Sequence, residues 1–258
     1  MLPRFSANIG FLFTDLPLLE RIQAAADCGF EVVEAHWPYD HSPDEVKAAL
    51  TAAGVTMCGL NTSRGNEKNG EAGLAAVPGR QSDFQNHFNQ ALTFVRHIGV
   101  PMIHVMAGIV DPQDQLAARQ TFIENLSWAA AQADDRMLLI EPINTRDIPG
   151  YFLNRSDQAA EIITEIGAAN VKMMFDLYHV QIMEGDLIRR LEKHLPMIGH
   201  IQFASVPLRH EPDEGEVAFP AVFEAIDALG YAGLVGAEYK PRAGVREGLG
   251  WGREFGLG

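Results

Sequence analysis

The stretch LLIEPIN, Leu138–Asn144, opens with three aliphatic residues suited to a buried strand and then places Glu141 where that strand would end. The same pattern recurs three times downstream. VKMMFD ends on Asp176, HIQFAS places Gln202 after an apolar residue, and GLVGAE ends on Glu238. Four strand-like segments thus finish near an oxygen-bearing side chain, which a strand that only builds a core does not require.

Around these segments, short apolar runs alternate with longer helical patterns along the 258 residues. Such alternation is typical of a parallel sheet, and eight units in a chain of this length predict a closed (β/α)8 TIM barrel. No linker or low-complexity run divides the chain, so we expect one domain over residues 1–258. The strand-like segments are FSANIGFLF, EVVEAHW, MCGLN, MIHVMAG, RMLLIEPIN, VKMMFDLYHV, HIQFAS and GLVGAEYK.

In a TIM barrel the C-terminal ends of the strands build the active site. Glu141, Asp176, Gln202 and Glu238 would end the fifth to eighth strands, so their side chains would converge. Three carboxylates that meet in this way repel one another unless a cation holds them. A set of oxygen ligands favours Mg²⁺ or Mn²⁺ over Zn²⁺, so the pattern predicts a divalent metal site.

Composition limits the class of partner. The formal net charge of −14, from 34 acidic and 20 basic residues, argues against nucleic acid and favours a small molecule. No long apolar run and no signal-peptide pattern occurs, so we expect a cytoplasmic protein without a membrane partner. Cys28 and Cys58 lie in apolar segments and are expected to be buried free thiols. Composition leaves open whether the chain forms a homo-oligomer.

Several motifs resemble the hydroxypyruvate isomerase family, which belongs to the xylose-isomerase-like TIM barrels together with the ketose 3-epimerases. The motifs are IEPIN, FDLYHVQ, HIQFA, RHEPDEGE and EYKPR, and the resemblance extends from Arg4 to Trp251. It implies a barrel that holds one divalent cation and moves a proton between two glutamates. Matched position by position, those glutamates are Glu141 and Glu238, which also bind the metal with Asp176 and Gln202.

The resemblance also suggests substrate contacts. His179, three residues after Asp176, and Arg209, in the loop after the seventh strand, match positions that touch substrate oxygens. Further candidates come from strand position alone. His104 either reaches the site from the fourth strand or is a rim histidine, Asp147 closely follows Glu141, and Lys240 either steers an acidic substrate or faces away.

The loop after the third strand, Thr62–Arg80, is long, polar and rich in glycine, which favours a lid over a plain surface excursion. Its second half, GEAGLAAVPGR, resembles the family pattern. Its first half, SRGNEKN, departs from the Pro-Gly-Asp sequence usual in the family. This departure bears on which substrate the site accepts.

The implied reaction moves a proton between neighbouring carbons of a small hydroxy-oxo acid, by way of an enediolate. Our first reading is the conversion of hydroxypyruvate to 2-hydroxy-3-oxopropanoate. The alternative is isomerisation of a four-carbon 2-oxotetronate to its 3-oxo partner, which HVMAG and LRHEPDEGE favour, whereas EPINTRDIPGYFLN favours the first reading. A ketose 3-epimerase and a sugar-acid binder without chemistry stay open, while the net charge disfavours an endonuclease.

Overall fold

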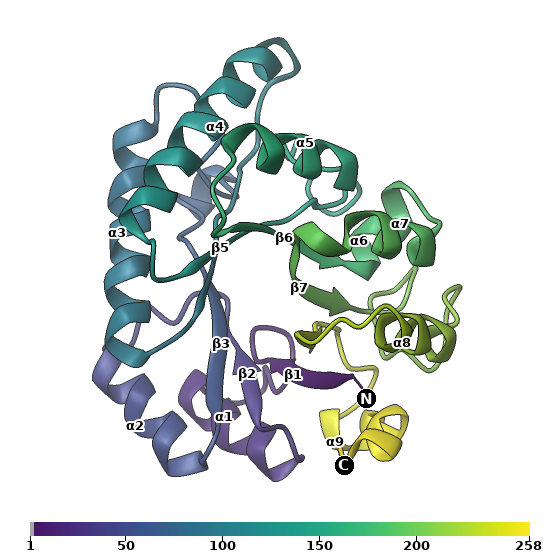
Figure 1. Cartoon of the computed structure of the whole chain (residues 1–258). Coiled ribbons are helices and arrows are strands. Elements are labelled where there is room, and N and C mark those ends of the chain that lie inside the picture. The colour runs from purple at the N-terminus through teal and green to yellow at the C-terminus, as the bar shows by residue number, and fades with distance from the viewer. Residues whose placement is uncertain (1–2) are drawn as a thin grey trace.

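Eight parallel strands close into a barrel in chain order, with β8 pairing β1 (Figure 1). The structure is a computed structural model that describes residues 3–258. The closed barrel confirms the predicted architecture. The strands are β1 Arg4–Asn8, β2 Val32–Glu34, β3 Thr56–Asn61, β4 Met102–His104, β5 Met137–Ile140, β6 Val171–Asp176, β7 Ile198–Phe203 and β8 Leu234–Ala237.

Helices surround the barrel and cover the outer faces of its strands (Figure 1). Local signals set their ends. Ser42 begins α2 with a capping box that includes Glu45, and Gly54 ends it at a φ of 69°, which only glycine adopts without strain. The helices are α1 Leu18–Asp27, α2 Pro43–Ala53, α3 Gln81–Ile98, α4 Gln115–Gln132, α5 Ser156–Ile166, α6 Leu177–Met183, α7 Leu187–His194, α8 Phe219–Ala228 and α9 Val245–Gly248, with short 3₁₀ turns η1 Glu67–Asn69, η2 Pro112–Asp114, η3 Leu195–Met197 and η4 Leu249–Phe255.

Aromatic packing closes the seam between the two ends of the chain. The Phe5 ring on β1 lies 5.2 Å from the Trp251 ring and 5.0 Å from the Phe255 ring, both in η4. Phe203 on β7 joins the same cluster, 5.7 Å from Phe5. The glycine-rich C-terminal stretch, for which we expected irregular structure, therefore forms α9 and η4, because these aromatic side chains anchor it to the barrel.

The loop after β3 has two parts with different packing. Its second part is buried at Ala72 and Ala76, and Ala76 N donates a 2.7 Å hydrogen bond to Ala107 O in the loop after β4. Its first part, around η1, is exposed. The second part is thus anchored to the barrel, and closure of the first part over a ligand stays a prediction. Among the described residues, no helix is long and apolar enough to cross a membrane.

Candidate active site

The strand-end residues converge as expected at the C-terminal end of the barrel. Glu141 directly follows β5, Glu238 directly follows β8, and Asp176 stands opposite Gln202 in the register of β6 and β7. All four side chains are buried. A cavity of about 330 Å³ opens beside them, lined by Gly10, Phe11, His36, Trp37, Asn61, Arg64, His104, Met106, Glu141, Ile143, Asp147, Ile148, His179, Arg209 and Glu238.

Three of the four strand-end residues carry a buried oxygen that has no hydrogen-bond partner in the protein. Glu141 Oε1, Asp176 Oδ2 and Gln202 Oε1 have no hydrogen-bond partner. An unsatisfied buried acceptor costs about 1–3 kcal/mol, so such atoms call for a ligand. Ligand atoms of Glu141, Asp176 and His179 also lie within 4.8 Å of one another. Buried residues of this site can therefore bind a metal ion, and their oxygens suit a hard divalent cation.

The surroundings of Glu141 offer little positive charge to balance its carboxylate. Burial raises its pKa well above the usual range, and the charges of Glu238 and Asp176 add to the effect. The nearest cationic or imidazole nitrogens are those of His179, with Nε2 3.6 Å from Oε1, and His104, with Nε2 3.5 Å from Oε2. Burial lowers the pKa of His104 to about 3, so this imidazole is neutral and does not balance the carboxylate.

Glu238 has the opposite environment. Asn8 Nδ2 donates a 2.8 Å hydrogen bond to Oε1, His36 Nε2 lies 2.9 Å from the same oxygen, and Arg209 binds Oε2. Burial by itself raises the pKa of Glu238, but the Arg209 guanidinium and the His36 hydrogen bond outweigh it and lower the pKa to about 2. Glu238 is thus held as a carboxylate, whereas the metal-free site favours the protonated form of Glu141.

A buried carboxylate beneath the pocket orients Gln202. Gln202 Nε2 donates to Glu34 Oε2 at 2.8 Å, and because Glu34 only accepts, the amide oxygen Oε1 must point away from it. Ser6 Oγ donates to Glu34 at 2.9 Å, and His200 Nε2 lies 3.2 Å from it. Sequence reasoning missed Glu34, although EVVE ends its strand on a glutamate as LLIE does.

His179 is oriented as a hydrogen-bond donor. Its Nδ1 accepts the backbone N–H of Asn144 at 3.2 Å, so the proton of the neutral ring sits on Nε2. That nitrogen lies 3.4 Å from Asp176 Oδ2. Burial, with the nearby Arg209 charge, lowers the pKa of His179 well below its usual range. In this tautomer Nε2 is a hydrogen-bond donor.

Arg209 balances the charge of the carboxylates. Its Nη2 binds Glu238 and lies 3.6 Å from Asp176 Oδ2, and its Nη1 lies 3.9 Å from Asp147 Oδ2. Its guanidinium is stacked between the rings of Phe11, at 4.4 Å, and Tyr178, at 4.7 Å. Arg209 thus hydrogen-bonds one carboxylate, that of Glu238, and its charge also lies within 4 Å of two others.

The remaining predicted contacts divide into two groups. His104 and Asp147 line the cavity, and Asp147 Oδ2 accepts a 2.9 Å hydrogen bond from Tyr178. Lys240 is exposed and absent from the lining, with Nζ 6.0 Å from the Phe11 ring centroid. The structure therefore brings together all the predicted site residues except Lys240. It adds Arg64 and Asn8, which strand-end patterns did not single out, and it includes His36, a candidate from its position at the end of the second strand, as His104 is from the fourth.

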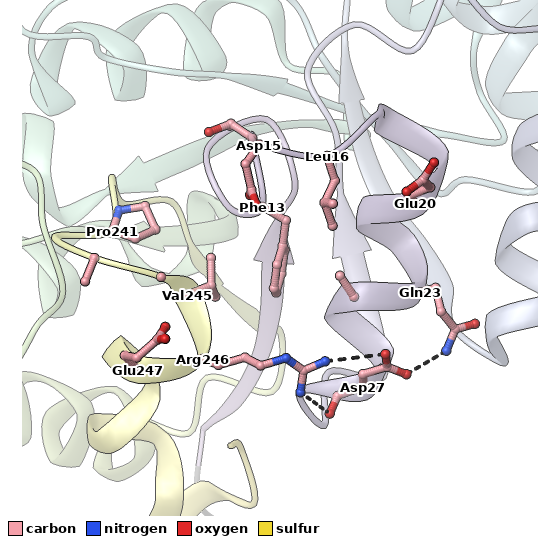
Figure 2. A pocket seen from close by; sticks show the side chains of 14 residues that line it. Phe13, Asp15, Leu16, Glu20, Gln23, Asp27, Pro241, Val245, Arg246 and Glu247 are labelled. Carbon is pink, nitrogen blue, oxygen red and sulfur yellow. Dashed lines mark hydrogen bonds and ion pairs between the residues drawn. The ribbon is translucent and has the colours of Figure 1, made fainter.

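A larger groove of about 870 Å³ lies elsewhere, between α1 and the C-terminal segment (Figure 2). The cation among its lining residues, Arg246, is paired with a carboxylate of the same groove. Arg246 Nη2 lies 3.4 Å from Asp27 Oδ2, and Gln23 donates a 2.8 Å hydrogen bond to Asp27. Among the described groove-lining residues, none carries a buried polar atom without a partner. The smaller cavity is therefore the candidate active site.

Comparison with known proteins identifies the class to which this barrel, with its buried carboxylates, belongs. A family model described as xylose isomerase-like TIM barrel matches residues 22–255. The chain belongs to the hydroxypyruvate isomerase and 2-oxo-tetronate isomerase family within that class, and it is an isomerase.

Individual relatives support this assignment over the full chain. It is 49% identical to the 2-oxo-tetronate isomerase of Cupriavidus necator, with 97% of each chain covered. It is 38% identical to the hydroxypyruvate isomerase of Escherichia coli, with 96% of this chain and 97% of the relative covered. A crystal structure described as an AP endonuclease, family 2, from Brucella melitensis superposes with a TM-score of 0.96 at 39% identity, covering 98% of this chain and 99% of the other.

Proposed function

We propose that this isomerase interconverts a 2-oxo-tetronate and its 3-oxo partner by moving a proton between C3 and C2. The observation that carries the reaction type is the pair of buried glutamates, Glu141 and Glu238, that line one cavity from the ends of β5 and β8. The 2-oxo-tetronate isomerase at 49% identity supports the four-carbon substrate. On this basis we place the four-carbon acid ahead of hydroxypyruvate, the reading that sequence motifs alone put first.

A divalent cation, Mg²⁺ or Mn²⁺, fits the proposed site because Glu141 Oε1, Asp176 Oδ2 and Gln202 Oε1 are buried without protein partners. The residues that would hold it are Glu141, Asp176, Gln202 and Glu238. When bound, it would supply a Lewis acid that stabilises negative charge on the substrate oxygens. Glu34 accepts from Gln202 Nε2, which leaves the amide oxygen Oε1 available to the cation.

The two glutamates would carry the proton. One glutamate, as the carboxylate, removes the proton from C3, and the other, as the protonated acid, delivers a proton to C2; in the reverse direction they exchange roles. His179 donates its Nε2 proton as a hydrogen bond to a substrate oxygen, on which charge builds during the transfer. Arg209 keeps Glu238 ionised and ready to accept a proton. Phe11 and Trp37 line the cavity and exclude water from it.

Proton NMR in D₂O tests the proposal. The Mg²⁺-loaded protein is incubated separately with each of the two C3 enantiomers of 2-oxo-tetronate and with hydroxypyruvate. We expect the 3-oxo acid to form with solvent deuterium at C2, because a carboxylate exposed between the two steps exchanges its proton. The same sample of Glu141→Gln protein is the control for uncatalysed enolisation.

Each outcome assigns the substrate. Turnover of the four-carbon acid at a rate well above that of hydroxypyruvate supports the proposal. Turnover of hydroxypyruvate alone would return the three-carbon acid to first place. Inactivity toward both acids in protein that binds Mg²⁺ would overturn the proposed reaction.

A further inference from the structure

The proposed substrate is an anion, and the cavity that receives it is already acidic. Glu141, Glu238 and Asp147 all line it. Binding a further carboxylate there requires a cationic partner with donors to spare. Among the described residues that line the cavity, the permanent cations are Arg64 and Arg209.

Arg209 does not meet this requirement, because protein carboxylates already compensate its charge. Its Nη2 binds Glu238, Asp176 and Asp147 lie 3.6 and 3.9 Å from its terminal nitrogens, and its Nε donates to the backbone oxygen of Glu238 at 3.4 Å. Its side chain is only 11% exposed between two aromatic rings. A substrate carboxylate that recruited Arg209 would have to compete with these three protein carboxylates.

Arg64 has what Arg209 lacks. Its Nε is buried and has no hydrogen-bond partner, although the residue lines the cavity. Its one ion pair joins Nη1 to Glu67 Oε2 at 3.2 Å, and that carboxylate is 59% exposed, so the pair is weak and exchangeable. A guanidinium that lines a cavity, lacks a buried carboxylate partner and has a buried N–H without an acceptor is suited to an anionic group of the ligand.

The surroundings hold Arg64 in place. Its guanidinium lies 5.2 Å from the centroid of the Trp37 ring, and Trp37 Nε1 donates a 3.0 Å hydrogen bond to Thr62 O. Arg64 O accepts from Gly73 N at 2.8 Å, which ties the residue to the anchored part of the loop. Arg64 also belongs to SRGNEKN, where the sequence departs from the family pattern. An arginine that is stacked on a ring and held through its backbone presents its guanidinium N–H groups to a carboxylate in a fixed geometry.

We propose that Arg64 binds the carboxylate of the substrate and so selects acids over neutral sugars, with Trp37 as its positioning residue. This inference rests on the proposed function for the identity of the ligand. It assigns different work to the two arginines of the cavity. Arg209 forms ion pairs with the protein carboxylates, and Arg64 recognises the substrate.

Calorimetric binding of unreactive ligands tests the assignment without relying on turnover. The Mg²⁺-loaded wild type, Arg64→Met, Arg64→Lys and Lys68→Met are titrated with erythronate, a four-carbon acid, and with erythrulose, its neutral ketose counterpart. Lys68 is the matched control because it is an exposed cation of the same loop and is absent from the lining. KM and kcat for the 2-oxo-tetronate are measured in parallel.

We expect Arg64→Met to weaken erythronate binding and raise KM by about 10- to 100-fold, with a smaller change in kcat. Erythrulose binding should stay unchanged, Arg64→Lys should recover part of the affinity, and Lys68→Met should resemble the wild type. Unchanged erythronate binding in Arg64→Met, or equal loss for both ligands, would overturn the assignment. Wild-type protein that binds erythronate through Arg64 yet turns over neither acid would overturn the proposed function instead.

Discussion

Two hollows of this protein, the groove beside α1 and the cavity at the strand ends, differ in how well their polar groups are paired. Their sizes do not predict this difference. The groove beside α1 measures about 870 Å³ and the cavity at the strand ends about 330 Å³. In the larger one Arg246, Asp27 and Gln23 satisfy one another (Figure 2). In the smaller one Glu141 Oε1 and Arg64 Nε are buried and unpaired. Of these two hollows, the smaller one thus contains the buried polar atoms that the fold leaves unpaired, and leaving them so costs stability unless a ligand completes them.

The largest expected effect follows from removing either of the two glutamates that we propose carry the proton. Glu141→Gln and Glu238→Gln keep the side-chain volume and remove the carboxylate, so each should lower kcat by about 10³-fold or more. Steady-state kinetics on the Mg²⁺-loaded variants measure this loss. A variant that retains more than a tenth of the wild-type rate would show that its glutamate does not carry the proton.

The same two substitutions should act in opposite directions on the stability of the metal-free protein. Glu238→Gln leaves the buried Arg209 without its main partner, which typically costs about 3–5 kcal/mol of unfolding free energy. Glu141→Gln replaces a carboxyl group whose pKa is raised by burial and by two neighbouring carboxylates, so its cost should be near zero or negative. Urea unfolding in the presence of a chelator measures both. Equal destabilisation by the two variants would contradict the contrast between their environments.

Asp176 gives the metal-free protein a distinctive pH dependence. Burial, with Glu238 nearby, raises its pKa to about 7 against the opposing charge of Arg209. Between its ordinary value and about 7, the folded chain binds this proton and the unfolded chain does not, so the unfolding free energy falls as pH rises through that window. Relative to Asp176→Asn, wild-type protein should lose on the order of 2 kcal/mol between about pH 5 and pH 7.

The measurement is the difference in unfolding free energy between metal-free wild type and Asp176→Asn across this pH range. Taking the difference cancels the other titrating groups that the two proteins share. Saturating Mg²⁺ should remove the loss in the wild type, because a cation favours the ionised carboxylate. A pH-independent difference would mean that Asp176 has the same pKa in the folded and the unfolded chain.

Sequence patterns predicted the barrel and the meeting of Glu141, Asp176, Gln202 and Glu238, because parallel strands bring their C-terminal ends to one place. They could not predict how the charges pair. Arg209 reaches three carboxylates from a loop in which its own φ is 59°, a conformation that no period in the sequence signals.

The two cations near the pocket mouth show the same limit. Lys240 follows Glu238 by two residues, yet it lies beyond the end of β8 and is exposed. Arg64 sits in a polar loop that resembles any surface segment, yet its loop folds back so that the guanidinium stacks on Trp37 beside the cavity. Strand periodicity holds inside the barrel, whereas tertiary contacts place the loop residues.

The smallest expected effect tests the larger hollow. Arg246→Ala removes the ion pair with Asp27, but the two side chains are 60% and 49% exposed, and water replaces such a contact at little cost. The variant should lose at most about 1 kcal/mol of unfolding free energy and keep kcat and KM for the 2-oxo-tetronate within about twofold. The same kinetic and urea measurements decide it. A marked loss of turnover would mean that the groove affects the cavity. Pairing of the polar groups in a pocket would then not indicate that the pocket has no part in catalysis.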